Sequence, residues 1–440
     1  MDHKLTLQAS ELAYRPQPQL EVMNFLNEVA EKFPGAISFA SGRPSEAFFD
    51  VPGWLEKIQL FVDHSSEARD VSPASVYTSL GQYGRTNGII NHLIAQSLQL
   101  DEKFTVDADD ILVTNGAQEG MALCLSALFT PGRDVLLITD PTYIGITGLA
   151  QIKGIEIAVV ESDDQGPNLE HLQQVCQQIK AEGKNPRSLY LIPDFNNPLG
   201  TSITLARRRE LLAYAQQSGL LLIEDNPYGA FRFEGEPLPT LKALDTGGHV
   251  IYIGTFAKTI CPGLRVGYLI SDQKLRSADG GETPLIEEFS KVKSLISVNT
   301  GQIAQAIVGG LLLEVDCSVN KAIEPLVSLY RDNRDVMLEA LEQHFHQGPA
   351  ALQQVSWNRP EGGFFLTLKL PMSFTGQQVF ECAEKFGVIC VPMSFFSNAG
   401  GHEHYIRLSF SYVNKEQIRS GVKALADYLL YLDGKSHEAA

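Results

Sequence analysis

The sequence lacks an excess of positive charge and has no long hydrophobic run. It contains 35 Lys and Arg against 52 Asp and Glu in 440 residues, a formal net charge of −17. Proteins that bind nucleic acids or anionic membranes need a basic surface, so this balance argues against both kinds of partner. No run of about eighteen apolar residues occurs, and the first residues, Met1-Asp-His-Lys-Leu-Thr, lack a signal peptide's apolar core. We therefore expect a cytoplasmic protein.

Paired cysteines and a metal-binding cluster are also missing. The six cysteines are scattered through apparently apolar segments, at Cys124, Cys176, Cys261, Cys317, Cys382 and Cys390. Without a paired framework they are typical of a reducing compartment. His344-Phe-His346 and His402-Glu-His404 have a spacing that attracts metal, but no carboxylate or cysteine set completes a site. We expect no bound metal.

Short apolar strands alternate with helical stretches between about Phe61 and Thr300. The segment Val135 to Thr139 reads as a buried strand, and Leu205 to Ser218 reads as a helix. This alternation predicts an α/β fold with a mostly parallel sheet and helices on both faces. A long helical stretch from Leu313 to His344 then leads to further strands, which predict a smaller α+β domain.

The length and composition allow more than one core. With 44% hydrophobic and 20% charged residues in 440, two domains are a reasonable expectation. We expect an N-terminal arm with part of the small domain in residues 1–60, a large cofactor-binding domain in 61–312 and a C-terminal small domain in 313–440.

Lys258 and Arg265 stand on either side of a loop that follows an apolar strand, in Thr255-Phe-Ala-Lys258-Thr-Ile-Cys-Pro-Gly-Leu-Arg265. An amine near apolar surface loses its proton more easily and can form a Schiff base with an aldehyde. The Thr255 hydroxyl and the Arg265 guanidinium are suited to hold a phosphate beside it. The pattern indicates a covalent aldehyde cofactor that carries a phosphate. A surface lysine and a solvated arginine remain the alternative.

Two more strand ends carry polar groups. Leu220 to Ile223 is followed by Asp225 and Tyr228, and a strand near Leu189 leads to Asn197. A carboxylate at such a point can keep a pyridine nitrogen protonated, while Tyr228 and Asn197 can donate to a ring oxygen. The alternatives are a capped turn for Asp225 and an ordinary Asn-Pro turn for Asn197.

Small residues mark a candidate phosphate site. Gly116, Ala117 and Gln118 lie between a strand that ends at Thr114 and an apolar helix, so backbone amides at the helix start can hold an anion. The glycine spacing fits neither a Walker loop nor a dinucleotide fingerprint. Farther along, Tyr143 follows a strand and can stack on a cofactor ring, or simply pack in its loop.

In this order, these motifs resemble those of the class I and II aminotransferases, pyridoxal-phosphate enzymes of fold type I. The likeness runs from about Ile37 to Leu432 and favours the subgroup of 2-aminoadipate, kynurenine and aromatic aminotransferases. It implies pyridoxal 5'-phosphate as the cofactor, an amino acid and a 2-oxo acid as substrates, and ping-pong kinetics. It also implies a homodimer, in which Tyr83 of one subunit reaches the cofactor of the other.

The resemblance assigns a role to each motif. Lys258 is implied to hold the cofactor as a Schiff base and to move the substrate's proton, with Asp225 on the ring nitrogen. Asn197 and Tyr228 are implied to hold the ring oxygen, and Tyr143 to stack on the ring. The phosphate would lie among Gly116, Ala117, Gln118, Thr255 and Arg265. Arg407, in a strand-like segment near the C-terminus, matches the family arginine that binds the substrate α-carboxylate, the alternative being a surface arginine on an edge strand.

The sequence departs from the family pattern at several positions. Ala257 stands where a serine is common, so one phosphate hydroxyl is missing, and Leu199 stands where a threonine is common. The segment that contains Gly42 and Arg43 matches the family's substrate-covering loop, but arginine is unusual there. Arg43 is a candidate contact for a substrate side-chain carboxylate or hydroxyl, and a structural salt bridge is the alternative.

The family contains more than one activity, so the sequence leaves the substrate open. Segments near Phe25 and after Gly42 resemble arylglycine transaminases of the dihydroxyphenylglycine type, which favours an aromatic or arylglycine donor over aliphatic or 2-aminoadipate substrates. The same scaffold supports β-elimination of cysteine conjugates. A third possibility, the aminotransferase-like domain of a transcription regulator, needs a winged-helix domain ahead of the fold, and fewer than forty residues precede Ile37.

Overall fold

A seven-stranded sheet forms the centre of the computed structural model, which describes residues 7–8, 11 and 18–438. The strand order is β2-β10-β9-β8-β7-β3-β4, and β10 alone runs antiparallel to its neighbours. The strands are β2 Ile111–Thr114, β3 Asp134–Thr139, β4 Glu156–Val160, β7 Asn185–Leu191, β8 Leu221–Asp225, β9 Val250–Thr255 and β10 Gly267–Ile270.

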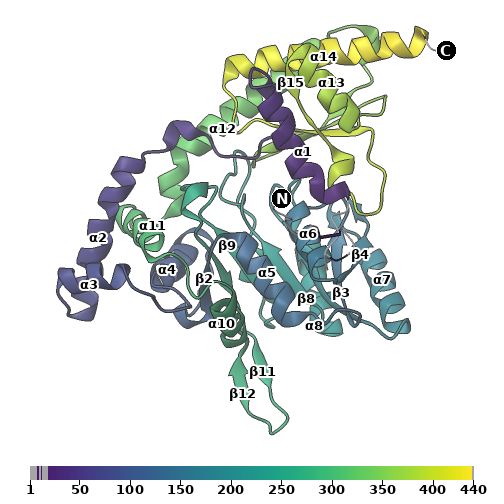
Figure 1. Cartoon of the computed structure of the whole chain (residues 1–440). Helices are drawn as coiled ribbons and strands as arrows, with labels where there is room; N and C mark the ends of the chain where they lie inside the picture. The colour runs from purple at the N-terminus through teal and green to yellow at the C-terminus, as the bar shows by residue number, and fades with distance from the viewer. Residues whose placement is uncertain (1–6, 9–10, 12–17, 439–440) are drawn as a thin grey trace, which may run out of the picture.

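Both faces of this sheet are covered by helices (Figure 1). Side chains alternate along a strand, so Leu136 and Ile138 of β3 pack in the core that includes α5 and α6. Val135 and Leu137 of the same strand pack in the core that includes α7 and α8. These helices are α5 Ala117–Leu128, α6 Ile144–Ile152, α7 Leu169–Ala181 and α8 Leu205–Ser218. The predicted α/β class with a mostly parallel sheet is confirmed.

The other helices complete the large layer and its flank. Together they are α2 Val51–Arg69, α3 Pro73–Leu80, α4 Asn91–Asp101, α9 Leu241–Leu244, α10 Leu285–Ile296 and α11 Gln302–Glu314. Two short hairpins pair β5 Ser162–Asp163 with β6 Gly166–Pro167, and β11 Lys274–Arg276 with β12 Glu282–Pro284. The second hairpin projects from the molecule at the bottom of Figure 1.

A smaller sheet lies above the large layer in Figure 1. Its order is β13-β14-β17-β16, and every pairing is antiparallel. Its elements are β13 Ser356–Trp357, β14 Phe365–Lys369, β16 Val391–Pro392 and β17 Tyr405–Ser409, with helices α12 Val319–Leu341, α13 Gly376–Phe386 and α14 Lys415–Glu438. From the N-terminus, α1 Pro18–Lys32 leads to β1 Ile37–Ser38, which pairs with β15 Val388–Ile389. The smaller α+β unit is therefore present, while the boundaries given above stay a prediction.

One expected helix is broken. The sequence predicts a long helical stretch from Leu313 to His344, but in the structure α11 ends at Glu314 and α12 begins at Val319. Asp316 and Cys317 have φ values of 53° and 62°, in the left-handed region where a right-handed helix cannot continue. The Ser318 side chain then accepts a hydrogen bond from Lys321 N at 3.2 Å and caps α12.

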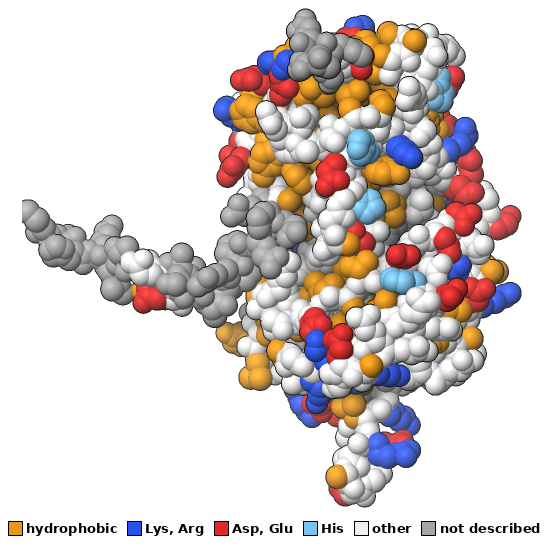
Figure 2. All heavy atoms as spheres, turned by 90° about the vertical axis from the view of Figure 1, so that its right-hand side faces the viewer, with side chains coloured by type: hydrophobic (Ala, Val, Ile, Leu, Met, Phe, Trp, Pro, Cys, Tyr) orange, Lys and Arg blue, Asp and Glu red, His pale blue; other side chains and the backbone are white. Residues whose placement is uncertain are grey.

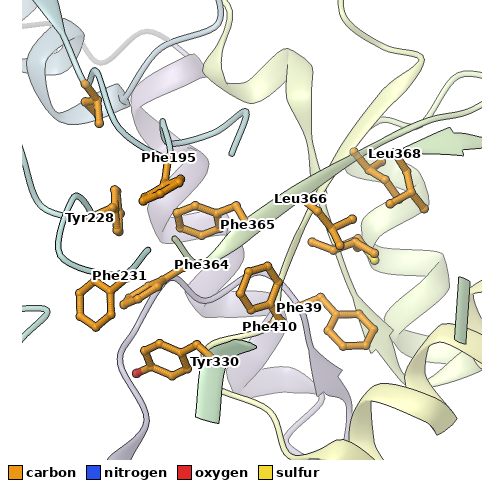
Figure 3. Close-up of a cluster of buried hydrophobic side chains, with 14 of the residues drawn as sticks. Phe39, Phe195, Tyr228, Phe231, Tyr330, Phe364, Phe365, Leu366, Leu368 and Phe410 are labelled. Atoms are coloured by element: carbon orange, nitrogen blue, oxygen red, sulfur yellow. The ribbon is translucent and has the colours of Figure 1, made fainter. Parts of the chain in front are cut away.

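An aromatic cluster joins the two units (Figure 3). The Phe364 ring lies 4.9 Å from the rings of Phe231 and Tyr330 and 5.2 Å from that of Tyr228, in edge or T-shaped contacts. Phe364 precedes β14, Tyr228 and Phe231 follow β8, and Tyr330 lies in α12. All four side chains are buried. Edge contacts of this kind add to the free energy of apolar burial and fix how the units meet.

The surface shows charges of both signs. On the face drawn in Figure 2, Lys and Arg side chains are interspersed with Asp and Glu. In the described part of the chain, no single helix is long and apolar enough to cross a membrane; α11 and the segment Val319–His346, bent by 89°, meet that requirement only as a pair.

Candidate active site

Lys258 lies three residues beyond the end of β9, where the chain leaves the large sheet. Its half-buried amine donates a hydrogen bond to Gly42 O at 2.8 Å and lies 6.0 Å from the centre of the Tyr228 ring. Burial, and then the positive charge of Arg407, lowers the pKa of Lys258 to about 8. The amine therefore gives up its proton close to neutral pH, as a nucleophilic amine must.

Asp225 is the last residue of β8 and is 3% exposed. Its Oδ2 accepts a hydrogen bond from the Tyr190 hydroxyl at 2.6 Å, whereas its buried Oδ1 has no partner among the described residues. Burial raises the pKa of Asp225 to about 6, against the opposing effect of the Tyr190 hydrogen bond and the charge of Lys258. A buried carboxylate with one free oxygen has room for a cationic donor.

Asn197 and Tyr228 come together as expected. Both are buried, and Asn197 lies close enough to the Tyr228 hydroxyl to lower its pKa against the effect of burial. The Asn197 Oδ1 also accepts a hydrogen bond from Arg407 Nη1 at 2.7 Å. Burial raises the pKa of the Tyr228 hydroxyl above its ordinary value, so it remains a proton donor at neutral pH.

The predicted anion site lies at the start of α5. Gly116 occupies the position before the helix with φ 75° and offers no side chain to cap it. The first amide groups of a helix have no acceptor within the helix, and here no side chain replaces one. Arg265 Nη2 donates to Asn115 O at 3.3 Å, and a Cβ atom at Gly116 would lie only 2.5 Å from that nitrogen. The glycine therefore lets the guanidinium approach the helix start.

Tyr143 and Thr255, the other residues predicted for this site, lie at the ends of secondary-structure elements of the large sheet layer. Tyr143 precedes α6, and its hydroxyl donates to Gln118 Oε1 at 3.3 Å. Thr255 ends β9, where its hydroxyl accepts a hydrogen bond from Ala257 N at 3.1 Å.

Arg407 lies in β17 of the small sheet, not on a solvent-exposed edge, and is 5% exposed. Its guanidinium lies 4.4 Å from the centre of the Phe365 ring and 4.8 Å from that of Phe396. Nη1 and Nη2 donate to Asn197 and to Ala40 O, but the buried Nε has no acceptor among the described residues. Burial lowers the pKa of Arg407 to about 10, so it is still a cation at neutral pH. A buried cation with a free donor is suited to bind an anion.

The loop before η2 Glu46–Phe48 covers this arginine and Lys258. A Cβ atom at Gly42 would lie 2.7 Å from Phe365 Cζ, so glycine permits the close approach. Arg43 is exposed, and its backbone oxygen accepts a hydrogen bond from the Ser411 hydroxyl at 2.7 Å. No ion pair to its guanidinium exists within the described residues. The salt-bridge alternative finds no support here.

Tyr83 stands apart from the other candidates. Its side chain is 81% exposed, and in the described part of this chain its only hydrogen bond runs from its backbone N to Gln82 Oε1. Its assigned position against a second subunit stays a prediction.

Several neighbours of the site escaped the sequence analysis. Tyr190 binds Asp225, and a tyrosine inside an otherwise apolar strand is a signal that its hydroxyl needs a buried partner. Phe365 and Phe396 enclose Arg407, but nothing in the sequence distinguishes them from other core aromatics. Glu119 accepts hydrogen bonds from Asn115 N and from the fully buried Lys293, each at 2.6 Å, and so supports the start of α5.

Neither histidine pair noted above has the surroundings of a metal site. In the part of the chain that the structure describes, no three His, Cys, Asp or Glu side chains are grouped so that they could hold an ion. His346 instead contacts Glu342 and stacks on Trp357.

The residues present fit pyridoxal phosphate. The free Oδ1 of Asp225 matches a protonated ring nitrogen, and the uncapped start of α5 with Arg265 matches a phosphate. Lys258 supplies the amine between them. The free Nε of Arg407 can bind a second anion, such as the carboxylate of a substrate.

Comparison with known proteins agrees with this fit. Residues 39–425 match the family described as aminotransferase class I and II. The chain is 42% identical to the (S)-3,5-dihydroxyphenylglycine transaminase of Amycolatopsis orientalis, over 93% of this chain and 91% of that protein. It is 32% identical to aromatic-amino-acid aminotransferase 1 of Thermococcus litoralis, over 89% and 87% of the two chains.

A solved structure shows the same architecture. The kynurenine aminotransferase of Pyrococcus horikoshii, crystallised in complex with PMP, KYN as substrates and KYA as products, superposes with a TM-score of 0.80. It is 28% identical, and the match covers 97% of each chain. The chain therefore belongs to the class I and II aminotransferases, enzymes that use pyridoxal 5'-phosphate to exchange an amino group between an amino acid and a 2-oxo acid.

Proposed function

We propose that this aminotransferase takes L-amino acids with aromatic or arylglycine side chains as amino donors. The observation that carries the active-site assignment is the pair of unpartnered buried atoms, Asp225 Oδ1 and Arg407 Nε, on two side chains whose charges both act on the Lys258 amine. The substrate class is supported by the 42% identity to a dihydroxyphenylglycine transaminase and the 32% identity to an aromatic aminotransferase.

In this proposal each residue acts on the substrate or the cofactor from a fixed position. Bound pyridoxal phosphate supplies a carbonyl carbon and a ring that accepts the substrate's electron pair. Arg407 binds the α-carboxylate through its free Nε, and Lys258, with a pKa near 8, takes the Cα proton and returns it on the cofactor side. Asp225 stabilises the positive ring nitrogen, while Asn197 and Tyr228 donate to the ring oxygen.

We further propose that Arg43 binds the substrate side chain. Its positive charge contributes to the lowered pKa of Lys258, so the guanidinium acts on the reacting amine. Because its side chain is exposed and its backbone is held by Ser411, the guanidinium is free to reach a hydroxyl or carboxylate on a substrate.

We also propose a cytoplasmic homodimer. All six cysteines are free thiols, as in a reducing compartment. Leu295 is 89% exposed and Ile296 is 56% exposed at the end of α10, while Val298 and Ile303, in the following loop and in α11, are 46% and 55% exposed. Large apolar side chains that are exposed so close together in the chain are typical of an interaction surface. We propose that a second copy covers this surface, and the resemblance implies that its Tyr83, exposed in the single chain, then reaches the cofactor.

The dimer can be tested at the surface that would form it. Leu295→Glu should shift the protein from the mass of two chains to that of one in sedimentation equilibrium, because a carboxylate cannot be buried there without a partner. Lys291→Glu, in the same helix but with Lys291 outside the exposed apolar set, is the control. A wild-type protein with the mass of one chain would contradict the proposal.

The activity is tested by mixing the holoenzyme with single amino acids in the absence of any oxo acid. We expect an arylglycine or aromatic amino acid to convert the bound cofactor to its amino form, with one equivalent of 2-oxo acid. Lys258→Ala should lower this rate at least about a thousandfold, because no other described amine replaces it. Absorbance spectra follow the form of the cofactor, and product analysis measures the 2-oxo acid. Catalytic release of pyruvate and ammonia from cysteine conjugates would instead identify a lyase.

The ionisation of Asp225 should appear in cofactor affinity. With a pKa near 6 in the free protein, Asp225 is mostly protonated at pH 5 and cannot stabilise a cationic ring nitrogen. The dissociation constant of pyridoxal phosphate should therefore rise about tenfold more between pH 7 and pH 5 in the wild type than in Asp225→Asn. The phosphate of the ligand also ionises in this pH range, but its effect on the dissociation constant is the same in both proteins and cancels in the comparison. Equal pH dependence in both would exclude this role.

The role of Arg43 predicts a change of specificity. Arg43→Leu should lower kcat/KM for 3,5-dihydroxyphenylglycine about tenfold more than for phenylglycine, because only the former offers hydroxyls to the guanidinium. Arg209→Leu removes an exposed arginine from α8 and should change neither value. If Arg43→Leu lowers kcat/KM for both substrates by the same factor, Arg43 does not bind the hydroxyls of the substrate side chain.

A further inference from the structure

Asp140 connects the two units of the molecule beside the site. It directly follows β3, and its side chain is 6% exposed. Its Oδ1 accepts a hydrogen bond from Asn398 N at 2.6 Å, and its Oδ2 accepts one from the Ser397 hydroxyl, also at 2.6 Å. His402 Nε2 lies 3.4 Å from Oδ2. All three partners come from the loop that follows η7 Met393–Phe396.

The two chain segments that meet at Asp140 both lead to the active site. On the large side, Tyr143 lies three residues farther along and is held in place by Gln118. On the small side, Phe396 immediately precedes Ser397, and its ring lies against the Arg407 guanidinium at 4.8 Å. A backbone hydrogen bond from Thr142 N to Phe396 O, 3.1 Å long, runs beside the Asp140 contacts.

These hydrogen bonds join a loop of the small unit to the large unit. Both carboxylate oxygens of Asp140 accept short hydrogen bonds from the same loop of the small unit. Ser397 is only 3% exposed, and its hydroxyl donates to Asp140 Oδ2 at 2.6 Å in preference to Gly400 O, which lies farther away at 3.2 Å. Charge-assisted hydrogen bonds of this kind are about twice as strong as neutral ones.

We propose that Asp140 is a positioning residue that fastens the loop 396–398 of the small unit to the large one, and so holds Phe396 and Arg407 in line with Lys258. The inference rests on the proposed role of Arg407 as the α-carboxylate site. Tyr143 and the phosphate site belong wholly to the large unit, so they do not need this attachment. Loss of Asp140 should thus weaken carboxylate binding and leave cofactor binding intact.

The test measures two dissociation constants by calorimetry: that of 3-phenylpropionate, an unreactive aromatic carboxylate, from the holoenzyme, and that of pyridoxal phosphate from the protein stripped of cofactor. Asp140→Asn and Ser397→Ala should each weaken 3-phenylpropionate binding about tenfold and leave the pyridoxal phosphate constant within about twofold. Ser397→Ala removes the hydrogen bond to residue 140 and Asp140→Asn removes the charge that strengthens it, so the double variant should lose less affinity than the sum of the two single losses. Asp109→Asn, which changes an exposed carboxylate, is the control.

Each other result overturns the proposal. Unchanged carboxylate affinity in both variants would show that the attachment does not position Arg407. An equal loss of affinity for both ligands would show a general structural role. So would a thermal midpoint so low that part of the variant protein is unfolded at the temperature of the binding experiment. If the wild-type holoenzyme fails to bind 3-phenylpropionate and Arg407→Lys reacts with amino acids as the wild type does, the assigned role of Arg407 fails, and this inference with it.

Discussion

The site depends on two opposite charges that the fold buries without fully satisfying. Asp225 is held at the end of a central strand with one free oxygen, and Arg407 is held between two phenylalanines with one free N–H. A buried charge that lacks a partner destabilises the protein by several kcal/mol. A ligand of opposite charge that binds to either group would offset that cost. In the proposed roles, a cofactor with a cationic ring and the carboxylate of an amino acid supply those charges, and both Asp225 and Arg407 act on the Lys258 amine.

The arrangement of the sheet explains why these groups meet. Parallel strands bring their carboxyl ends to one edge, so the residues after β2, β3, β7, β8 and β9 gather there although they are far apart in the sequence. Arg407 is the exception, because it arrives from the small sheet. Its position therefore depends on two contacts between the units. One is the aromatic cluster around Phe364, and the other is the set of hydrogen bonds between Asp140 and the loop that follows η7.

The sequence predicted what local patterns encode and missed what tertiary packing decides. Strand ends and helix starts are visible in the alternation of apolar and polar residues, so the neighbourhood of Lys258, Asp225 and Gly116 was predictable. Phe365 and Phe396 are ordinary core aromatics in sequence, and only the pairing of distant segments places them against Arg407. The break between α11 and α12 was missed for a similar reason, because left-handed backbone at Asp316 and Cys317 carries no glycine to announce it.

Glu119 links the phosphate site to the apolar surface on α10. Its carboxylate holds Asn115 N at the start of α5 and also accepts from Lys293 and Ser297 at the end of α10. Lys293 is fully buried, so removing either partner would leave a buried charge alone. Leu295 and Ile296 extend from the same helix end into solvent. A partner that covered these side chains, as proposed above, would therefore pack on the same helix end that supports the start of α5 through Glu119.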